Sequence, residues 1–518
     1  MRSTFLDKPS SSKSPLNIPS NNQPNCDSST KLRPADSILK DIGWRNVYVL
    51  RIALLASLSW ALAAMSIMCS AFYITTNENS SISNGSTFFL IKNVTSSSST
   101  YDAEYLKKVA DYSTSLFMFG NMIGATILTY ASDKVGRKPI MVIAMICLAL
   151  TGFIALFGDQ IVLLPYSRFL QGICTPGLLL LGWVLAYECT PVSFRAYASL
   201  IFGCLWVIGY CVVALIAYCT PNWILITITC TAPSAITGIL FAAVLPESLH
   251  FLVIKKKVAK VKKWINEARK FETKRIILNA EEVMYASLVE VDDKEKFLEE
   301  TAIGSSKSQS RRFVDELTYN RVFFAYLFIF AYLWTCDTFI YYGLSLYTTK
   351  LVGNAYWNYA LSGLIELPVY ILTPVFLERY GRKPIVSVTH FVAGAVLIAY
   401  IFVQDSSTIA KLLYIIGKFS ISCSFICIFV YSSEVFPTTI RSGCVGACTI
   451  IARIGGVLSP YVGVLAVFAD FVPVLFFGSL SVLAATLTLL LPETRKQALP
   501  SSLVEIKKQR NEESVSSR

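Results

Sequence analysis

The chain has 518 residues, of which 54% are hydrophobic and only 15% charged, and its mean hydropathy is +0.54. A soluble protein of this size could not cover so much apolar surface, so the composition excludes one and predicts an all-α membrane protein. The formal net charge is +12. The basic residues lie in short clusters between apolar runs, which is typical of topology signals and not of nucleic-acid binding.

Twelve apolar segments follow one another along the chain and predict twelve transmembrane helices. The runs are too long and too uniformly apolar for barrel strands, whose residues alternate. The first six segments form a half over 44–248, and the last six form a second half over 321–494. In chain order the predicted spans are 47–74, 110–131, 139–158, 161–186, 196–219, 223–245, 321–345, 356–378, 385–404, 410–431, 443–468 and 471–492.

The chain ends and the first outer loop carry the signals for orientation. Residues 1–43 are rich in Ser, Pro and Asn, lack a cleavable signal peptide and predict a disordered cytoplasmic tail. The loop 75–109 contains the only three Asn-X-Ser/Thr sequons of the chain, which predict glycosylation on the non-cytoplasmic face. The acceptor residues are Asn79, Asn84 and Asn93. Six spans in each half then place both termini, including the tail 495–518, in the cytoplasm of a plasma-membrane protein.

The linker 249–320 is rich in lysine, which predicts that it is cytoplasmic. Within it, the segment 256–271 has the pattern of an amphipathic helix. Two interpretations are equally favoured: a helix that lies on the anionic inner leaflet, or a solvated charged helix.

Three short motifs occur twice in the same order, which indicates a duplicated six-span unit. The offset is nearly constant, since 382 − 137 = 245 and 492 − 246 = 246. Parallel repeats of this kind are the architecture of one large class of transporters. The matched segments are 133–139 with 378–384, 188 and 195 with 434 and 441, and 246–248 with 492–494.

The first two motifs place acids and bases at helix ends on the predicted cytoplasmic face. They can act as plain positive-inside anchors, but their recurrence in both halves favours a latch that closes an inner gate. Glycine in each Gly-Arg-Lys-Pro motif permits a tight turn, and proline can begin the next helix. The predicted gate residues are Asp133, Arg137, Glu188, Arg195, Glu378, Arg382, Glu434 and Arg441.

Other functional classes find little support in the sequence. Nearly all of the 14 cysteines lie in apolar runs, where packing between helices is the expected role, and only two histidines are present. We therefore expect no metal site and no cofactor. No phosphate-binding loop and no catalytic constellation occurs, so an enzyme is not expected. A receptor or scaffold that only binds is possible, but the duplicated gate motifs argue against it.

Four ionisable residues are predicted deep inside spans of the second half. Ionisable side chains are costly there, so each is a candidate for substrate binding, although an internal structural ion pair is the alternative for each. Glu366 lies about 18 Å from the inner end of its span and Arg453 about 15 Å, at 1.5 Å per residue. The four are Asp337, Glu366, Lys418 and Arg453. The second half would then set charge selectivity.

Together these residues resemble the major facilitator superfamily, and within it the organic cation, anion and zwitterion (carnitine-type) transporters. The resemblance covers about 44–500. It is carried by the stretches 341–346 (YYGLSL), 361–368 (LSGLIELP), 431–441 (YSSEVFPTTIR) and 168–172 (RFLQG). It implies a major facilitator fold of two pseudo-symmetric halves.

Two departures from related patterns are informative. Members of the family usually have a longer first outer loop with disulfide-forming cysteines, whereas 75–109 contains none. Oligomerisation through that loop is therefore in doubt. The sugar-transporter branch shares some motifs, but it normally has a Gln-Gln signature in span seven, where this chain reads Trp334 to Ile340. A facilitator of neutral polar solutes is the second interpretation.

The resemblance also implies which residues face the substrate. Cation transporters tend to have an acid at the position of Arg453, whereas anion and carnitine-type members have Arg. Glu366 resembles the acid of the cation and carnitine-type members. Aromatic faces can hold quaternary ammonium groups or flat anions. The aromatic candidates are Trp183, Trp206, Trp334, Tyr341, Tyr342, Phe425 and Phe429.

The expected function is transport of small charged organic solutes by alternating access. An Arg together with a Glu favours organic anions or zwitterions such as carnitine over simple cations. The expected partners are this substrate and the lipid bilayer, and the coupling ion is not determined by the sequence.

Overall fold

The computed structural model describes residues 39–40, 42–73, 103–157, 160–220, 222–255, 257–271, 321–351, 353–403, 407–437, 440–469 and 471–495. Across these ranges the regular structure is helical throughout. The sequons at Asn79, Asn84 and Asn93 lie outside the described residues, as do most of both tails and most of the linker.

The first half contains six spans in seven α-helices. Short 3-10 turns extend the first and third spans, and the sixth span is made of two helices. The elements are α2 (Val47–Met68) with η1 (Cys69–Phe72), α4 (Ala103–Val135), α5 (Arg137–Gly152) with η2 (Phe153–Leu156), α6 (Gln160–Cys189), η3 (Val192–Phe194), α7 (Arg195–Cys219), α8 (Trp223–Thr231) and α9 (Pro233–Val244).

The second half repeats this plan. Its elements are α14 (Arg321–Tyr347) with η4 (Thr348–Lys350), α15 (Ala355–Leu364), α16 (Glu366–Tyr380), α17 (Arg382–Ala399) with η5 (Tyr400–Val403), α18 (Ser407–Val435), α19 (Arg441–Leu458) with η6 (Ser459–Val467), and α20 (Val472–Thr488). In the described part of the chain, nine helices are long and apolar enough to cross a membrane. The longer but more polar α4 and the shorter α5 and α20 complete the twelve predicted spans.

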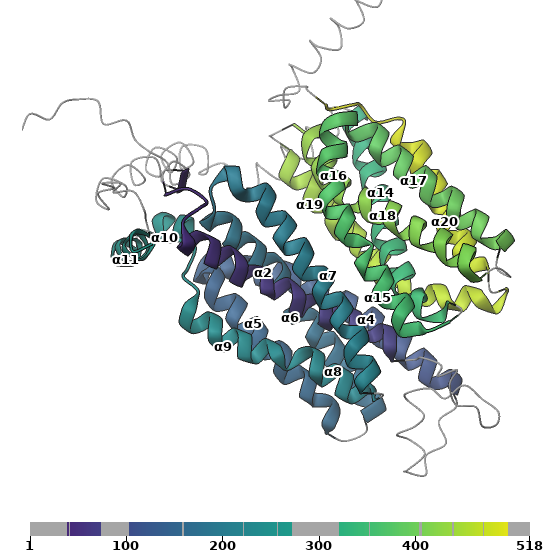
Figure 1. The fold of residues 1–518 in the computed structure, drawn as a ribbon, viewed down its shortest axis with the longest axis horizontal. Helices are drawn as coiled ribbons and strands as arrows, with labels where there is room; N and C mark the ends of the chain where they lie inside the picture. The colour runs from purple at the N-terminus through teal and green to yellow at the C-terminus, as the bar shows by residue number, and fades with distance from the viewer. Residues whose placement is uncertain are drawn as a thin grey trace, which may run out of the picture.

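The helix pairs that pack in the first half recur in the second. In the first half, α2 packs on α6 and α7, and α5 packs on α6 and α9. In the second half, α14 packs on α18 and α19, and α17 packs on α18 and α20. The duplicated motifs of the sequence therefore correspond to a duplicated arrangement of helices (Figure 1).

The structure departs most clearly from the predicted spans at one boundary and at two internal divisions. Helix α4 begins at Ala103 and so extends into the predicted loop 75–109. The sixth span is divided just before Pro233, which cannot donate a backbone hydrogen bond. The eighth span is divided at Ile365, so that Glu366 becomes the first residue of α16. Pro233 is visible in the sequence as the cause of the first break, whereas the apolar run around Ile365 does not show where the eighth span divides.

The outer surface of the bundle is apolar. Large side chains such as Ile236, Phe402 and Val467 are among the most exposed residues of the described chain. Exposed aliphatic surface on this scale is unfavourable in water and is expected for helices surrounded by lipid.

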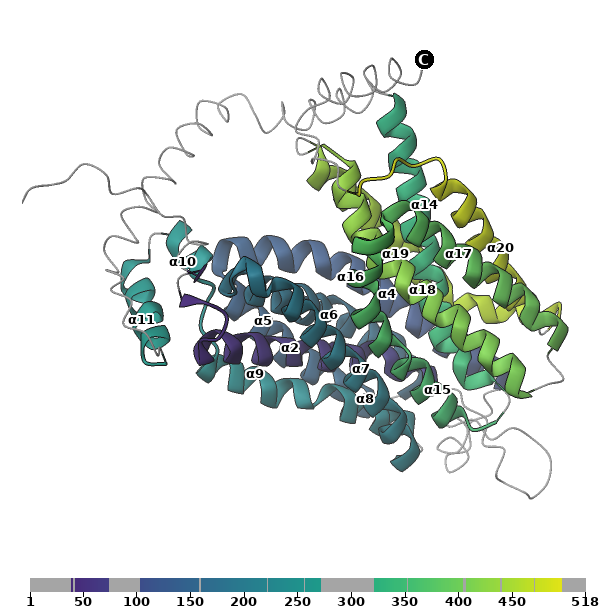
Figure 2. The ribbon, with the colours of Figure 1, turned by 45° about the horizontal axis from the view of Figure 1, so that its top comes forward.

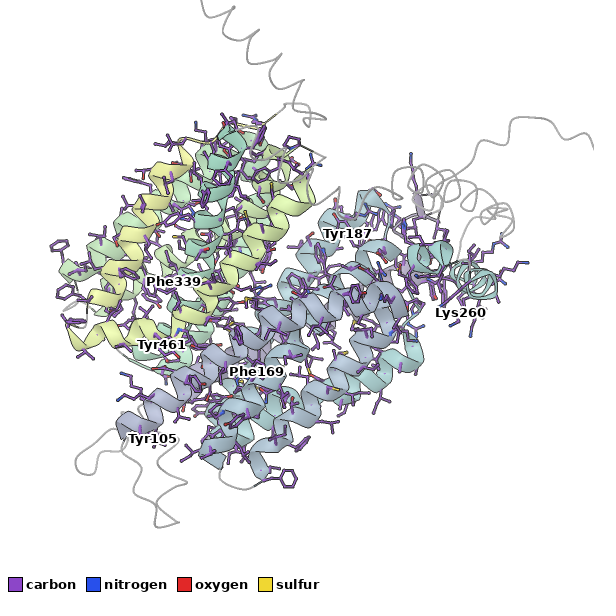
Figure 3. All side chains as sticks on the ribbon, turned by 180° about the vertical axis from the view of Figure 1, so that it is seen from behind. Tyr105, Phe169, Tyr187, Lys260, Phe339 and Tyr461 are labelled. Atoms are coloured by element: carbon purple, nitrogen blue, oxygen red, sulfur yellow. The ribbon has the colours of Figure 1, made fainter. Side chains whose placement is uncertain are left out.

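The two halves are inclined to each other and meet along two seams (Figures 1 and 2). Helix α4 packs on α19, and α7 packs on α15 and α16. We call the end of the bundle that holds the Gly-Arg-Lys-Pro motifs the motif end, and the opposite end the loop end. Figure 3 labels Lys260 beyond the motif end and Tyr105 at the loop end.

Contacts between the halves gather towards the loop end. The Ser115 hydroxyl donates to the Val457 carbonyl at 2.8 Å. The ring of Phe72 stacks on Tyr356 with centroids 5.6 Å apart, and Tyr359 donates to the Met68 carbonyl. At the motif end, every ion pair described lies inside one half.

The predicted amphipathic segment 256–271 contains helix α11 (Val258–Arg269), which follows the short helix α10 (Leu249–Ile254). Its apolar face is buried against the first half, where Trp264 meets Tyr48 with ring centroids 5.5 Å apart. Asn46 also donates to the Ala268 carbonyl at 3.0 Å. The apolar face of α11 thus contacts protein, while Lys260 on the opposite face is exposed.

Candidate functional site

A buried ion pair lies at the break in the eighth span. The Glu366 side chain is buried at the start of α16, and the ammonium Nζ of Lys418 on α18 lies 3.2 Å from its Oε1. A buried charge is tolerated only where it is paired and hydrogen-bonded. The two predicted charges therefore neutralise each other.

The Lys418 ammonium is satisfied on its other sides by α14. It donates to the Ser345 hydroxyl at 2.6 Å and to the Tyr341 carbonyl at 3.3 Å. It also lies 3.4 Å from the centroid of the Tyr341 ring, which is a favourable cation–π arrangement. Ser345 was not among the predicted site residues, although it lies one turn from Tyr341 on the same helix face.

Tyr341 joins this ion pair to the first half. Its hydroxyl donates to Glu366 Oε2 at 3.0 Å and accepts from the indole Nε1 of Trp206 on α7 at 3.1 Å. Three predicted residues from three different helices thus form one hydrogen-bonded chain. The chain crosses the boundary between the halves, where a transporter of this architecture binds its substrate.

The predicted aromatic residues form a continuous series of ring contacts. In the second half, Phe425 stacks on Tyr341 at 5.6 Å, and Phe429 meets Trp334 edge-on at 4.2 Å. Tyr342 packs edge-on against Tyr341 at 5.3 Å.

In the first half, the link between the predicted rings is Trp60 of α2, which was not predicted. Its ring lies 5.6 Å from that of Trp183 and 6.2 Å from that of Trp206. Its indole nitrogen donates to the Leu179 carbonyl at 2.9 Å. Trp60 sits in an apolar run, so only its position opposite Trp183 and Trp206 distinguishes it from a packing residue.

Close approach of the halves beside the ion pair depends on two glycines. A side chain at Gly203 would meet the Tyr370 ring at 2.5 Å, and one at Gly363 would meet the Tyr210 ring at 2.5 Å. Tyr210 in turn stacks on Tyr359 with centroids 4.4 Å apart. The absence of side chains at these glycines allows α7 to lie directly on α15 and α16.

Arg453 differs from the other predicted charges. It is partly buried on α19, and its positive charge acts on the Tyr342 hydroxyl. No acidic side chain lies within ion-pair distance of it in the described ranges, whereas Lys418 has Glu366. The candidate site therefore has one unbalanced positive charge.

Asp337 does not join this group. Its carboxylate is fully buried and contacts His390 of α17 and Ser424 of α18 instead. Neither partner was predicted, because a histidine and a serine inside apolar runs give no sign of their neighbours on other helices.

A further buried cation, Arg168, lies in α6 as the first residue of the stretch 168–172 (RFLQG). Its guanidinium donates to Gln171 at 2.7 Å and to the Ser66 carbonyl at 2.9 Å. It lies 4.1 Å from the centroid of the Phe117 ring. These contacts tie α6 to α2 and α4, so buried charge is not confined to the second half.

At the motif end, the predicted gate residues pair within each half. Arg137 lies 3.0 Å from Asp133 and 3.2 Å from Glu188. In the second half Arg382 lies 2.9 Å from Glu434. The partner of each glutamate is thus the arginine of the Gly-Arg-Lys-Pro motif.

The other three predicted gate residues make different contacts. The Arg195 guanidinium lies 4.6 Å from the centroid of the Tyr187 ring. Arg441 donates to the Phe436 carbonyl at 3.2 Å. Glu378 is exposed at the end of α16.

The third repeated motif, Pro-Glu-Ser or Pro-Glu-Thr, completes this network. Glu247 accepts from the backbone amides of Arg137 and Lys138 at the start of α5, at 3.0 and 3.2 Å. Glu493 accepts from the amides of Arg382 and Lys383 at 3.0 and 3.1 Å. A carboxylate is well placed there because the first amides of a helix lack partners.

The serine or threonine of this motif binds the second repeated glutamate. The Ser248 hydroxyl donates to Glu188, and Thr494 donates to Glu434 at 2.7 Å. The three motifs therefore form one cluster in each half. The sequence showed their common offset but not that they meet in space.

Comparison with known proteins is consistent with this duplicated plan. The sequence profile described as Major Facilitator Superfamily matches residues 67–460. The chain belongs to the major facilitator superfamily.

Relatives place it in the organic ion transporter branch. A Caenorhabditis elegans protein named as a transporter is 34% identical over 483 residues, which cover 93% of each chain. A Drosophila melanogaster organic cation transporter protein is 34% identical over 76% of this chain and 70% of its own. A rabbit (Oryctolagus cuniculus) organic anion transporter 3 is 30% identical over 76% and 71%.

Solved structures support the fold. The xylose transporter of E. coli, in a partially occluded inward-open conformation, superposes with a TM-score of 0.62 over 87% of this chain and all of its own. Its sequence is only 14% identical, so the likeness concerns the major facilitator fold and not the substrate.

Proposed function

We propose that this major facilitator protein carries small organic ions across the plasma membrane by alternating access, and that it prefers organic anions and zwitterions to simple cations. The names of the relatives support organic ions as the substrate class. One observation favours the charge preference: Glu366 is neutralised by Lys418, while Arg453 has no acidic partner in the described chain.

The charge balance explains this preference. A cation entering the site would meet Arg453 without a free carboxylate to offset it, and like charges in a low-dielectric site repel strongly. An anion would supply the counter-charge that Arg453 lacks. A zwitterion could also place its cationic group against the aromatic series formed by Tyr341, Phe425 and Trp334.

Uptake into vesicles that contain the purified full-length protein tests the proposal. The probes are benzenesulfonate, carnitine, tetraethylammonium and glucose. We expect saturable uptake of the first two. Arg453→Ala should reduce that uptake about tenfold or more, which corresponds to roughly 1.4 kcal/mol of binding free energy.

Arg269→Ala is the matched control, because it removes one positive charge from the exposed surface of α11. It should leave uptake unchanged. Equal loss for all four probes in Arg453→Ala would contradict the charge assignment, and uptake of glucose alone would favour the neutral-solute alternative.

We propose further that the motif end is cytoplasmic and that the loop end faces outwards. The lysine-rich helix α11 lies beyond the motif end, whereas the sequons at Asn79, Asn84 and Asn93 lie between spans that end at the loop end. Glycosidase treatment of cell-surface protein should shift its mobility, and replacing all three asparagines by glutamine should abolish the shift. An unglycosylated chain at the surface would contradict this orientation.

A further inference from the structure

The second half contains a buried cluster of titratable groups that the proposed substrate site does not use. Asp337 of α14, His390 of α17 and Ser424 of α18 are each fully buried. The Ser424 hydroxyl lies 3.1 Å from Asp337 Oδ2 and 2.8 Å from His390 Nε2, and His390 Nε2 lies 3.5 Å from Asp337 Oδ1. Three helices thus converge on one polar point.

The hydrogen bonds within the cluster leave two buried acceptor atoms without a partner in the described structure. If Ser424 donates its single hydrogen to Asp337, its oxygen can accept only from a protonated Nε2 of His390. Asp337 Oδ1 and His390 Nδ1 then remain buried with no hydrogen bond in the described structure. Both atoms can accept a proton, and buried acceptors without partners are unfavourable.

No permanent charge compensates the Asp337 carboxylate. The only cationic side chain within ion-pair distance of it in the described residues is His390, which is charged only when protonated. An isolated buried carboxylate is very costly. A bound proton removes this cost, whether it resides on the carboxyl group or on the imidazole.

The remaining titratable groups around the cluster do not supply this charge. The thiols of Cys336 on α14 and of Cys427 on α18 interact with Asp337, but a thiol carries no positive charge. Helix α20, which packs on α17, has no titratable side chain. In the described residues, no other charged group of the surrounding helices approaches Asp337 or His390 within 4 Å. Those charged residues are Glu366, Glu378 and Arg379 on α16, Arg441 and Arg453 on α19, Arg382 and Lys383 on α17, and Lys411, Lys418 and Glu434 on α18. The segments η5 and η6 contain no Asp, Glu, His, Lys or Arg, and their titratable side chains are Tyr400 and Tyr461.

The cluster is joined to the candidate substrate site through two helices. Asp337 lies one helical turn before Tyr341, which hydrogen-bonds Glu366. Ser424 directly precedes Phe425, whose ring stacks on Tyr341. A change of charge at the cluster therefore acts on the same segments of α14 and α18 that hold the Glu366–Lys418 pair.

We propose that Asp337, His390 and Ser424 form a proton-binding site that couples organic ion transport to pH. The proton binds when the cluster is sealed as described and is released when movement of the halves admits water. This inference rests on the proposed transport function. It adds the coupling ion, which the sequence did not indicate.

Two readouts on the full-length protein in vesicles test the proposal. The substrates are benzenesulfonate and carnitine, whose charges do not change over the pH range used. We expect uptake to change about tenfold between pH about 5.5 and about 8. With a pH-sensitive dye inside the vesicles, addition of substrate should change the internal pH.

The variants Asp337→Asn, His390→Asn and Ser424→Ala should each remove most of the pH dependence. The chain has only one other histidine, so His250→Asn is the matched control and should keep the wild-type profile. Thr389→Val, a neighbour of His390 whose hydroxyl bonds only its own helix, should also keep it.

Several outcomes would overturn the proposal. Saturable wild-type uptake that is independent of pH and leaves the internal pH constant would do so even if every variant failed to fold. So would loss of the pH profile in His250→Asn, or uptake that required sodium and not a proton gradient.

Failure of the proposed transport function can be distinguished from failure of the proton-site proposal. If no probe is taken up, the thermal unfolding midpoint of the purified protein is compared between pH about 5.5 and about 8. A step that is present in wild type and His250→Asn but lost in His390→Asn would support the proton site alone. Identical profiles in all three proteins would exclude it.

Discussion

The indole nitrogen of Trp206 donates to the hydroxyl of Tyr341 over 3.1 Å, and this bond crosses from the first half to the second. Both side chains are buried, and the Tyr341 hydroxyl also donates to Glu366. Movement that separates the halves at this point breaks a bond whose acceptor, Tyr341, also hydrogen-bonds Glu366.

Trp206→Phe tests the role of this cross-half bond. Phenylalanine keeps an aromatic ring in the series but cannot donate, so the described arrangement should lose about 1 kcal/mol relative to other arrangements. We expect a several-fold change in transport rate and in the labelling of cysteines placed at the motif end.

Tyr341→Phe removes this bond and also the hydrogen bond to Glu366, so its effect should be at least as large. The double variant should be less than additive, because both changes remove the same cross-half bond. Strict additivity of the two single variants would show that Trp206 and Tyr341 act independently.

The ion pair of Glu366 and Lys418 predicts a strong dependence of stability on charge balance. Lys418→Gln leaves the buried carboxylate of Glu366 without its cation and should lower the free energy of unfolding by about 3 to 5 kcal/mol. The double variant Glu366→Gln with Lys418→Gln buries no charge and should regain most of that loss.

Thermal unfolding of the purified protein measures both effects. Lys411→Gln is the matched control, because it removes a lysine of the same helix that is not fully buried. If the double variant were no more stable than Lys418→Gln, Glu366 would have another compensating partner.

The turns of the two Gly-Arg-Lys-Pro motifs require glycine. Gly136 has φ of 130° and Gly381 has φ of 102°, a region that other residues rarely adopt. A side chain would also meet the carboxylate of Glu247 at 2.4 Å or that of Glu493 at 2.8 Å. Gly136→Ala and Gly381→Ala should each destabilise the protein by about 1 to 3 kcal/mol.

Gly446→Ala is the control for this prediction, because a side chain there meets nothing within 4 Å. Its unfolding midpoint should stay at or slightly above that of wild type. Unchanged midpoints for the two motif glycines would mean that the turns relax without cost.

The two acids that contact Arg137 should contribute unequally. Asp133 is 60% exposed, whereas Glu188 is 23% exposed and also accepts from Ser248. Exposed ion pairs contribute little, so Asp133→Asn should hardly change the conformational equilibrium. Glu188→Gln and Arg137→Gln should change it clearly.

Accessibility of cysteines introduced near the motif end measures that equilibrium. Glu434→Gln, the counterpart in the second half, should resemble Glu188→Gln, because Glu434 pairs with Arg382 and accepts from Thr494 in the same way. A large effect of Asp133→Asn with none for Glu188→Gln would contradict the observed network.

Residue patterns alone predicted much of the fold. The lengths of the apolar runs predicted twelve spans, and the repeated motifs predicted two related halves, because both depend on local composition and chain order. The resemblance to organic ion transporters is confirmed by the relatives. The division of the eighth span before Glu366 could not be predicted, since the apolar run continues through the break.

For the candidate site, too, the sequence predicted many of the residues but not all of their contacts. Sequence reasoning selected Glu366, Lys418, Tyr341 and Trp206, and the structure brings these four together. It also placed Asp337 with them, whereas the described contacts of Asp337 are to His390 and Ser424. Whether these residues bind substrate stays a prediction.

The sequence by itself determined that this chain spans the membrane many times, that it is duplicated, and that ionisable groups lie within its spans. Only the tertiary structure decided which charges cancel. Glu366 and Lys418 are 52 residues apart in the chain and Trp206 is 135 residues from Tyr341. Partners on different helices are selected by packing geometry, which hydropathy does not encode. That geometry leaves Arg453 as the unbalanced charge and encloses Asp337 with His390.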